Sequence, residues 1–202
     1  MGIKRFFKNK IKDRNFIKNK RKLKINNFEI KFFENYSFNF EIGKNPEVSI
    51  IILFSGSIRQ TLNCLYTLEQ YDKNISKEII IVNNEIAEDT LQFLDRIPGI
   101  VIINSDKDSD LTQNINKGIK SAKGEYMYML NSNVQIQEYC LSSLLDVFKT
   151  KENVGAVGSK IVSPDNTLQE AGCLILKKSG IISIGRGEAI DTPQYDYLRK
   201  VG

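Results

Sequence analysis

The chain has 202 residues, 41% of them apolar, and a formal net charge of +5, which suits one domain with an extension. No apolar run approaches the ~18 residues of a membrane span, and no apolar stretch of a secretory signal follows the basic start. The absence of histidine excludes Ser-His-Asp and Cys-His nucleophile systems and His-ligated metals.

The positive charge comes from the first part of the chain. Residues 1–44 hold 13 Lys/Arg and 4 Asp/Glu, whereas the remaining residues hold 16 basic and 20 acidic side chains. Residues 1–45 are therefore predicted to be a basic, Lys/Asn-rich leader, and residues 46–202 a separate domain. The charge does not indicate nucleic-acid binding, because the domain behind the leader is acidic.

Apolar residues recur with helical spacing near the start of the leader. Ile3, Phe7 and Ile11 are four residues apart, which predicts a short basic amphipathic helix. Such a helix suits docking on an anionic membrane surface through residues 1–24, and a solvated tail is the alternative. Residues 28–40 alternate weakly between apolar and polar side chains and are expected to form an added strand or an ordered arm.

Three apolar segments that end in polar residues predict parallel strands. Residues 49–54, 78–82 and 125–130 each run into hydroxyl or amide side chains. Because helix-like segments separate them, their carboxyl ends are expected to share one edge of a sheet, where open α/β sheets bind ligands. A short strand is also expected at 100–103. The polar side chains at this edge are Ser55, Asn83, Asn84, Asn131, Ser132 and Asn133.

Helices are predicted between these strands and after the last one. Ser57 and Ser109 are the expected N-caps of the first and third helices. Strands that alternate with helices predict an α/β fold with a doubly wound, mostly parallel sheet and helices on both faces. The four helices are expected near residues 57–68, 88–97, 109–124 and 138–149.

The pattern changes after residue 153. A further strand is expected at 154–158, a turn at 163–166, and a hairpin from 174–176 and 181–184. The chain then reaches Gly202 without a closing helix, which predicts a domain truncated at its C-terminus.

Two other patterns receive structural interpretations. Met127 and Met129 alternate with tyrosines on a predicted strand, and we expect them in the core. Asp106, Asp108 and Asp110 mimic the start of a calcium loop but lack its glycine and later glutamate. We therefore expect a solvated acidic loop.

The chain contains no glycine-rich phosphate motif. Neither G-x-G-x-x-G nor G-x-x-x-x-G-K-[ST] follows any predicted strand, which argues against a dinucleotide or P-loop site. The remaining option for such a sheet is a nucleotide held by the strand ends, with its diphosphate neutralised by a metal on carboxylates.

Several short segments, taken in order, resemble one known family. Their order and spacing are similar to the N-terminal part of a family-2 glycosyltransferase of the GT-A fold. The resemblance runs from about residue 46 to residue 202 and is strongest to the rhamnosyltransferase-like branch that builds bacterial surface polysaccharides. The segments include VSIII at 48–52, IVNN at 81–84, NINKGI at 114–119, LNSN at 130–133 and PDNTLQEAG at 164–172.

That resemblance implies a site for a nucleotide-diphosphate sugar, with Mg²⁺ or Mn²⁺ on its diphosphate. It also implies a glycan or lipid-linked acceptor, and a general base that is expected beyond Gly202, so no catalytic residue is assigned. By position, the resemblance assigns the metal to Asn133 and donor contacts to Phe54, Ser55, Asn83, Asn84, Asn114, Asn131 and Ser132.

The chain departs from the family pattern at functional positions. Asn83 stands where the family has an aspartate, and Asn133 stands where it has the last acid of its D-x-D motif. Because Mg²⁺ and Mn²⁺ favour anionic oxygen, Asn133 predicts weak metal binding. Asn83 retains the ability to hydrogen-bond a ribose hydroxyl or a base N–H. With the base missing, these departures predict a catalytically impaired chain.

Three functional hypotheses remain. The first is a truncated or impaired glycosyltransferase of surface-polysaccharide synthesis. The second is a non-catalytic module of the same fold that binds a nucleotide, a partner or a membrane. The third is a nucleotidyltransferase-like enzyme, which would need a basic, glycine-rich loop after the first strand. Isolated cysteines indicate a reducing compartment, so we expect the cytoplasm, with the inner membrane face as a peripheral site.

Overall fold

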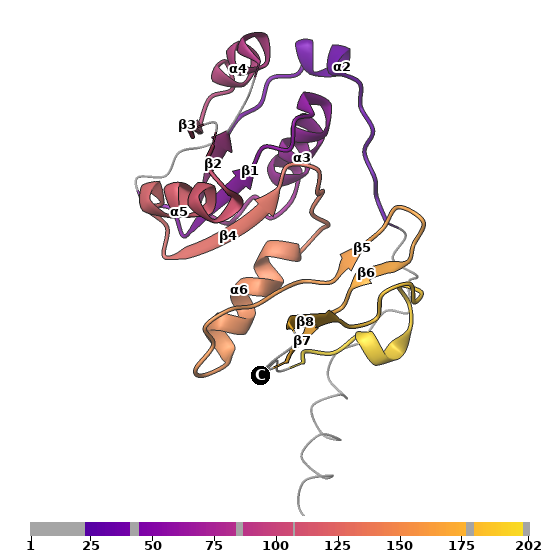
Figure 1. Ribbon diagram of the computed structural model, residues 1–202. Coiled ribbons are helices and arrows are strands. Elements are labelled where there is room, and N and C mark those ends of the chain that lie inside the picture. Colours follow the sequence, from indigo (N-terminus) through magenta and orange to yellow (C-terminus); the bar gives the residue numbers. More distant parts are fainter. Residues whose placement is uncertain (1–22, 41–44, 84–86, 107, 177–179, 200–202) are drawn as a thin grey trace, which may run out of the picture. The chain divides into compact units, whose positions relative to one another are not determined.

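The computed structural model describes residues 23–40, 45–83, 87–106, 108–176 and 180–199 (Figure 1). The chain divides into two compact units, and each is described by itself: residues 24–161, and residues 162–202 with 1–23. The predicted leader helix and most of the proposed membrane contact lie outside the described residues. Within the described ranges, no helix has the length and apolar character needed to cross a membrane.

The larger unit is built on a four-stranded sheet in the order β3-β2-β1-β4, in which all neighbours are parallel (Figure 1). Leu53 is in register with Val82 on one side and with Asn131 on the other, so three strand ends are level. The predicted α/β fold with a parallel sheet is confirmed. The strands are β1 (Val48–Leu53), β2 (Lys77–Asn83), β3 (Ile100–Asn104) and β4 (Tyr126–Asn131).

The first and third of the helices between and after the strands begin at side-chain caps. Ser57 accepts a hydrogen bond from the Gln60 N–H, as predicted. The third helix is capped by Asp110 instead of Ser109, because Asp110 and Gln113 form a reciprocal capping box. The fourth begins two residues later than expected, after Tyr139 adopts a left-handed φ of 63°. The helices are α3 (Ile58–Gln70), α4 (Glu88–Asp95), α5 (Leu111–Ser121) and α6 (Cys140–Thr150).

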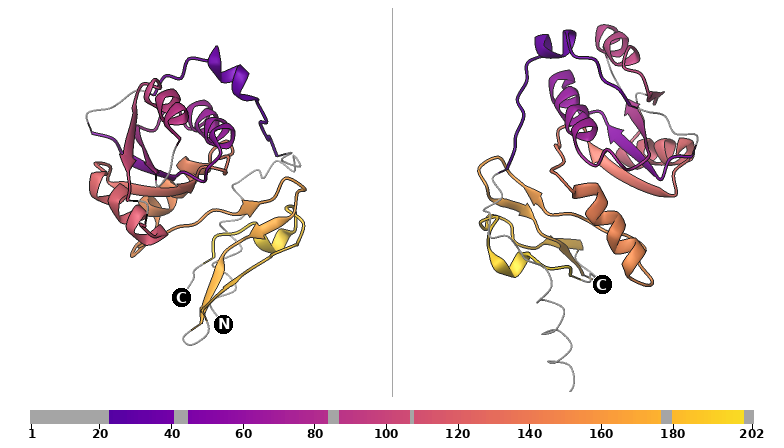
Figure 2. Two further views of the ribbon diagram at one scale, coloured as in Figure 1. Left: turned by 45° about the horizontal axis from the view of Figure 1, so that its top comes forward. Right: turned by 180° about the vertical axis from the view of Figure 1, so that it is seen from behind.

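The two faces of the sheet are covered by different helices, as Figure 2 shows for α3 and α5. Ile50 and Ile52 belong to the main core cluster with residues of α3, α4 and α6. Ile51 lies on the opposite face, where Ile80, Val82, Ile119 and Ala122 surround it. Gly118 permits this close packing of α5, because a Cβ there would lie 2.5 Å from Cγ2 of Ile51.

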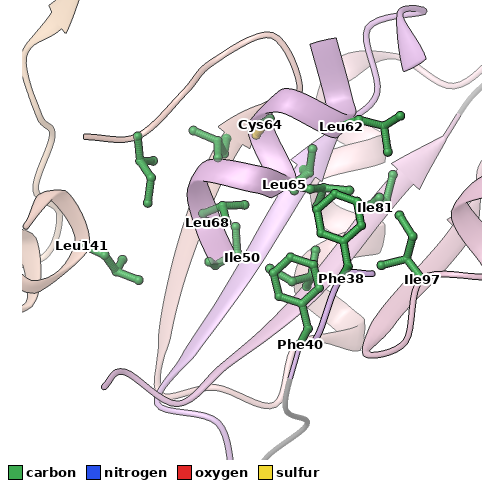
Figure 3. Packing of buried hydrophobic residues seen from close by; sticks show 14 of the residues in the cluster. Phe38, Phe40, Ile50, Leu62, Cys64, Leu65, Leu68, Ile81, Ile97 and Leu141 are labelled. Atoms are coloured by element: carbon green, nitrogen blue, oxygen red, sulfur yellow. The ribbon is translucent and has the colours of Figure 1, made fainter. Parts of the chain in front are cut away.

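Residues 24–40 form an ordered arm on the larger unit, and the alternative of an added strand is wrong. The arm contains the short helix α2 (Ile30–Glu34) between extended segments. Phe33, Phe38 and Phe40 are buried in the main core cluster, where Phe38 and Phe40 lie beside residues of the sheet and α3 (Figure 3). The core therefore includes residues whose composition placed them with the basic leader.

The methionines of β4 are exposed, which corrects the expectation that they lie in the core. Met127 and Met129 are 49% and 55% exposed. They share a sheet face with Ile51, but β4 is an edge strand and α5 packs on β1 and β2. Tyr128 and Leu130 point to the other face and contribute to the main core.

The smaller unit contains short antiparallel elements. The predicted hairpin is formed by β7 (Cys173–Leu176) and β8 (Gly180–Ser183). The predicted turn at 163–166 is closed by a 3.0 Å hydrogen bond from Asn166 N–H to the Ser163 carbonyl. In the larger unit, the prediction of a strand at 154–158 is wrong: these residues are largely exposed and pair with no strand in the part of the chain that the structure describes. The remaining elements are β5 (Ile161–Val162), β6 (Leu168–Glu170) and η1 (Pro193–Tyr195).

A buried hydrogen-bond network fixes the start of β4 at the amino edge of the sheet. The Glu78 side chain is buried and accepts hydrogen bonds from the Ser49 hydroxyl and, at 2.6 Å, from the Lys123 N–H. The Ser49 hydroxyl in turn accepts from the Gly124 N–H at 2.8 Å. The turn between α5 and β4 is therefore bound to β1 and β2, which sets the register of β4.

Replacing Gly124 with alanine is expected to destabilise the protein by about 1–3 kcal/mol, because the added Cβ overpacks this turn. It would lie 2.5 Å from the Ser49 nitrogen, and a backbone atom cannot rotate away. Urea unfolding measures the change. Gly155→Ala is the matched control, since nothing lies within 4 Å of its Cβ. Equal stabilities of the two variants would contradict the prediction.

Candidate functional site

The ends of β1 and β4 are joined by a pair of serines. Ser132 is fully buried, and its hydroxyl accepts a hydrogen bond from the Ser55 N–H at 2.9 Å. The two hydroxyl oxygens are 2.8 Å apart, and the Ser132 N–H donates to the Leu53 carbonyl at 3.1 Å. These contacts bring Ser55 and Ser132 together at the carboxyl edge, as their positions after two parallel strands predicted.

The end of β2 places Asn83 beside β3. Asn83 is only 5% exposed, and its Nδ2 donates to Oδ1 of Asn104 at 3.1 Å. The Phe54 N–H donates to the Val82 carbonyl at 3.1 Å, which holds the half-buried Phe54 against the same edge. Asn84 lies outside the described residues.

Helix α5 brings a further amide to this edge. Gly118 packs on Ile51 and Val82, and Asn114 lies one helical turn nearer the start of α5. Because α5 runs back from the carboxyl edge to the amino edge, that turn carries Asn114 toward the strand ends. The side chain is buried, with 5% exposure.

Three buried polar atoms in the described part of the chain have no hydrogen-bond partner. They are Oδ1 of Asn83, Oγ of Ser105 and Oδ1 of Asn114. An unsatisfied buried acceptor costs about 1–3 kcal/mol, and most buried polar groups in proteins are paired. Each of the two amide oxygens therefore has an acceptor capacity that no described donor fills.

Ser105 was not among the predicted site residues. It directly follows β3, and its N–H donates to the Asn83 carbonyl. The rule that identified the other polar strand ends also applies to β3. Extending it to the residues after 100–103 would have found Ser105 from the sequence.

The position predicted for a metal offers neutral ligands. Asn131 and Asn133 are exposed amides, and the hydroxyl of the intervening Ser132 is engaged with Ser55. Among the described residues, no group of three His, Cys, Asp or Glu side chains is placed to hold a metal. This donor set does not fit a divalent cation held by protein carboxylates.

The acidic loop before α5 does not replace the missing carboxylates. The Asp106 side chain is 87% exposed and pairs with Lys117 at 2.8 Å, and this hydrogen bond lowers the pKa of Asp106. The carboxylate of Asp110 caps α5. Asp106 is thus solvated, as expected for an acidic loop, and Asp110 has a structural partner.

Residues 49–193 match the family described as "Glycosyl transferase family 2". The chain belongs to this family. The resemblance inferred from the sequence motifs is therefore confirmed, and the parallel sheet with helices on both faces agrees with the GT-A architecture that it implied.

The chain is similar to one curated protein and to one solved structure. The O-antigen biosynthesis protein RfbC of Myxococcus xanthus is 25% identical over 145 residues, which are 69% of this chain and 11% of that protein. The mannosyltransferase PcManGT from Pyrobaculum calidifontis, solved in complex with GDP-Man and Mn²⁺, is 15% identical with a TM-score of 0.48. That match covers 67% of this chain and 42% of the mannosyltransferase. The chain thus spans less than half of either relative.

Replacing Ser132 with alanine is expected to destabilise the larger unit by about 1–2 kcal/mol, because the Ser55 N–H and hydroxyl lose their shared partner. Urea unfolding measures the change. Ser143→Ala, at an exposed position on α6, is the control and is expected to stay within about 0.5 kcal/mol of the unaltered protein. A Ser132 variant as stable as this control would contradict the role assigned to the serine pair.

Proposed function

We propose that this chain binds a nucleotide-diphosphate sugar at the carboxyl edge of its sheet. The bound sugar would pass to a glycan or lipid-linked acceptor in surface-polysaccharide synthesis. The observation that carries the proposal is the pair of buried, unpartnered amide oxygens of Asn83 and Asn114 in a family-2 glycosyltransferase domain. The relative that acts in O-antigen biosynthesis supports the class of product.

The chemistry of the edge suits the nucleoside part of such a donor. The Oδ1 atoms of Asn83 and Asn114 accept hydrogen bonds, and a base N–H or a ribose hydroxyl supplies the matching donor. Phe54 lies half-buried at the same edge, where it packs against the main core cluster, and the exposed part of its ring would contact the base. The exposed amides of Asn131 and Asn133 would donate N–H groups to diphosphate oxygens without adding negative charge.

The neutral residues at the end of β4, Asn131 and Asn133, also favour a second candidate function, which is nucleotide binding without sugar transfer. A domain with neutral residues at the metal position would bind a nucleotide without the metal that the family uses for transfer. Stabilisation by nucleotide that requires Mn²⁺ supports the first function. Stabilisation that is independent of the metal supports the second.

The proposed location is the cytoplasm, with residues 1–24 as a contact to the inner membrane face. Cys64, Cys140 and Cys173 are free thiols, which agrees with a reducing compartment. Burial raises the pKa of Cys64 to about 12, so this thiol stays protonated and unreactive.

Asn114→Ala is expected to weaken nucleotide binding about tenfold, because a ligand donor loses its buried acceptor. Thermal-shift titration with UDP, dTDP and GDP, with and without Mn²⁺, measures the affinity. Asn116→Ala is the matched control, since Asn116 is exposed on the same helix. Unaltered protein that none of the three nucleotides stabilises would refute the proposed function.

Asn133→Asp is expected to raise Mn²⁺-dependent nucleotide affinity about tenfold or more, because a carboxylate attracts a divalent cation that a neutral amide does not. The same titration measures it. Asn74→Asp adds an equal charge to the exposed loop before β2, at the opposite edge of the sheet, and should leave the affinity unchanged. Identical responses of the two variants would reject Asn133 as the metal position.

A further inference from the structure

Three side-chain amides hold the first part of the arm by its backbone. Each accepts a hydrogen bond from the N–H of one arm residue and donates a hydrogen bond to the carbonyl of the same residue. We call these three side chains the amide clamp. The pairs are Asn63 with Phe28 (3.0 and 2.9 Å), Gln135 with Asn26 (2.9 and 2.7 Å) and Gln137 with Lys24 (3.1 and 3.2 Å).

The spacing of the clamped residues is that of an extended strand. Residues 24, 26 and 28 are alternate positions, and in an extended backbone the N–H and C=O groups of alternate residues point to the same side. The amide clamp therefore replaces the neighbouring strand of a sheet. Because it binds main-chain atoms, it is a site for an extended peptide backbone, and the chain's own arm fills it.

Side-chain contacts fix the register of the arm in the clamp. The ring of Phe28 stacks on Phe32 with centroids 4.2 Å apart and meets Tyr66 of α3 edge-on at 5.1 Å. Arg59 of α3 donates to Asn27 at 2.9 Å and pairs with Glu29 at 3.1 Å. These contacts flank the Phe28 position, so a shift of the arm by one residue would break them together.

The clamp is connected to the candidate site through one short segment of chain. Gln135 and Gln137 lie in the connection between β4 and α6, which begins with Ser132 and Asn133. The same connection is anchored in the core by Ile136, whose N–H donates to the Thr67 hydroxyl at 3.2 Å. The arm thus contacts the segment that carries the predicted metal position.

We propose that docking of residues 24–28 in the amide clamp positions residues 132–137, the segment that carries Asn133 at the carboxyl edge. Gln135 and Gln137 are positioning residues: they act on the edge through the backbone that they share with Asn133. The consequence for a bound nucleotide rests on the proposed function. The coupling between the arm and residues 132–137 is a property of the protein without ligand.

Asn26→Pro tests this coupling from the arm side and leaves residues 132–137 unaltered. Proline removes the N–H that donates to Gln135. Ile25→Pro is the matched control, because Ile25 contributes no atom to the clamp and the residue before a proline favours the extended backbone that Lys24 needs. Hydrogen exchange of the full chain, read by mass spectrometry, reports on the hydrogen-bonded amides of Ser132, Val134 and Ile136.

The expected result is that Asn26→Pro raises exchange of these three amides about tenfold or more, while Ile25→Pro changes it less than about twofold. Unchanged exchange in Asn26→Pro, or an equal rise in both proline variants, would overturn the proposal. Nucleotide titration of the same proteins separates the two proposals. If the unaltered chain binds no nucleotide, the proposed function fails, and the exchange comparison still decides the coupling.

Discussion

The buried hydroxyl of Ser132 is the contact on which the carboxyl edge depends. This hydroxyl binds Ser55 and so holds the end of β4 level with the end of β1. The Ser132 N–H adds a hydrogen bond to the Leu53 carbonyl. The connection to α6, which carries Asn133 and both clamp glutamines, leaves from this fixed point. The edge is thus organised by backbone and hydroxyl hydrogen bonds.

Among the described residues, the strand ends carry neutral side chains at the positions where the family pattern implied by the resemblance has acids. Amides and hydroxyls occupy the strand ends, and the nearby carboxylates of Asp106 and Asp110 are committed to Lys117 and to the cap of α5. The buried acceptors of Asn83 and Asn114 lack hydrogen-bond partners, which costs the folded protein about 1–3 kcal/mol each, and the proposed ligand would supply the missing donors.

The arm changes how the larger unit is understood. Its composition suggests a basic leader, yet Phe33, Phe38 and Phe40 complete the core that α3 forms with the sheet. The Tyr36 hydroxyl donates a hydrogen bond to the Glu69 carboxylate. Burial is the larger cause of the raised pKa of Tyr36, and this hydrogen bond is the second. The arm is therefore part of the core and is also hydrogen-bonded to the segment that follows β4.

The sequence by itself determined the order of strands and helices, the Ser57 cap and the polar strand ends, because each is encoded in a short periodic pattern. Only the tertiary structure decided that β4 is an edge strand, which exposes Met127 and Met129. It also decided the amide clamp, two of whose pairs join residues 109 and 113 positions apart. Hydrogen bonds between side chains and distant backbone leave no periodic trace in a sequence, since they depend on where the folded elements meet.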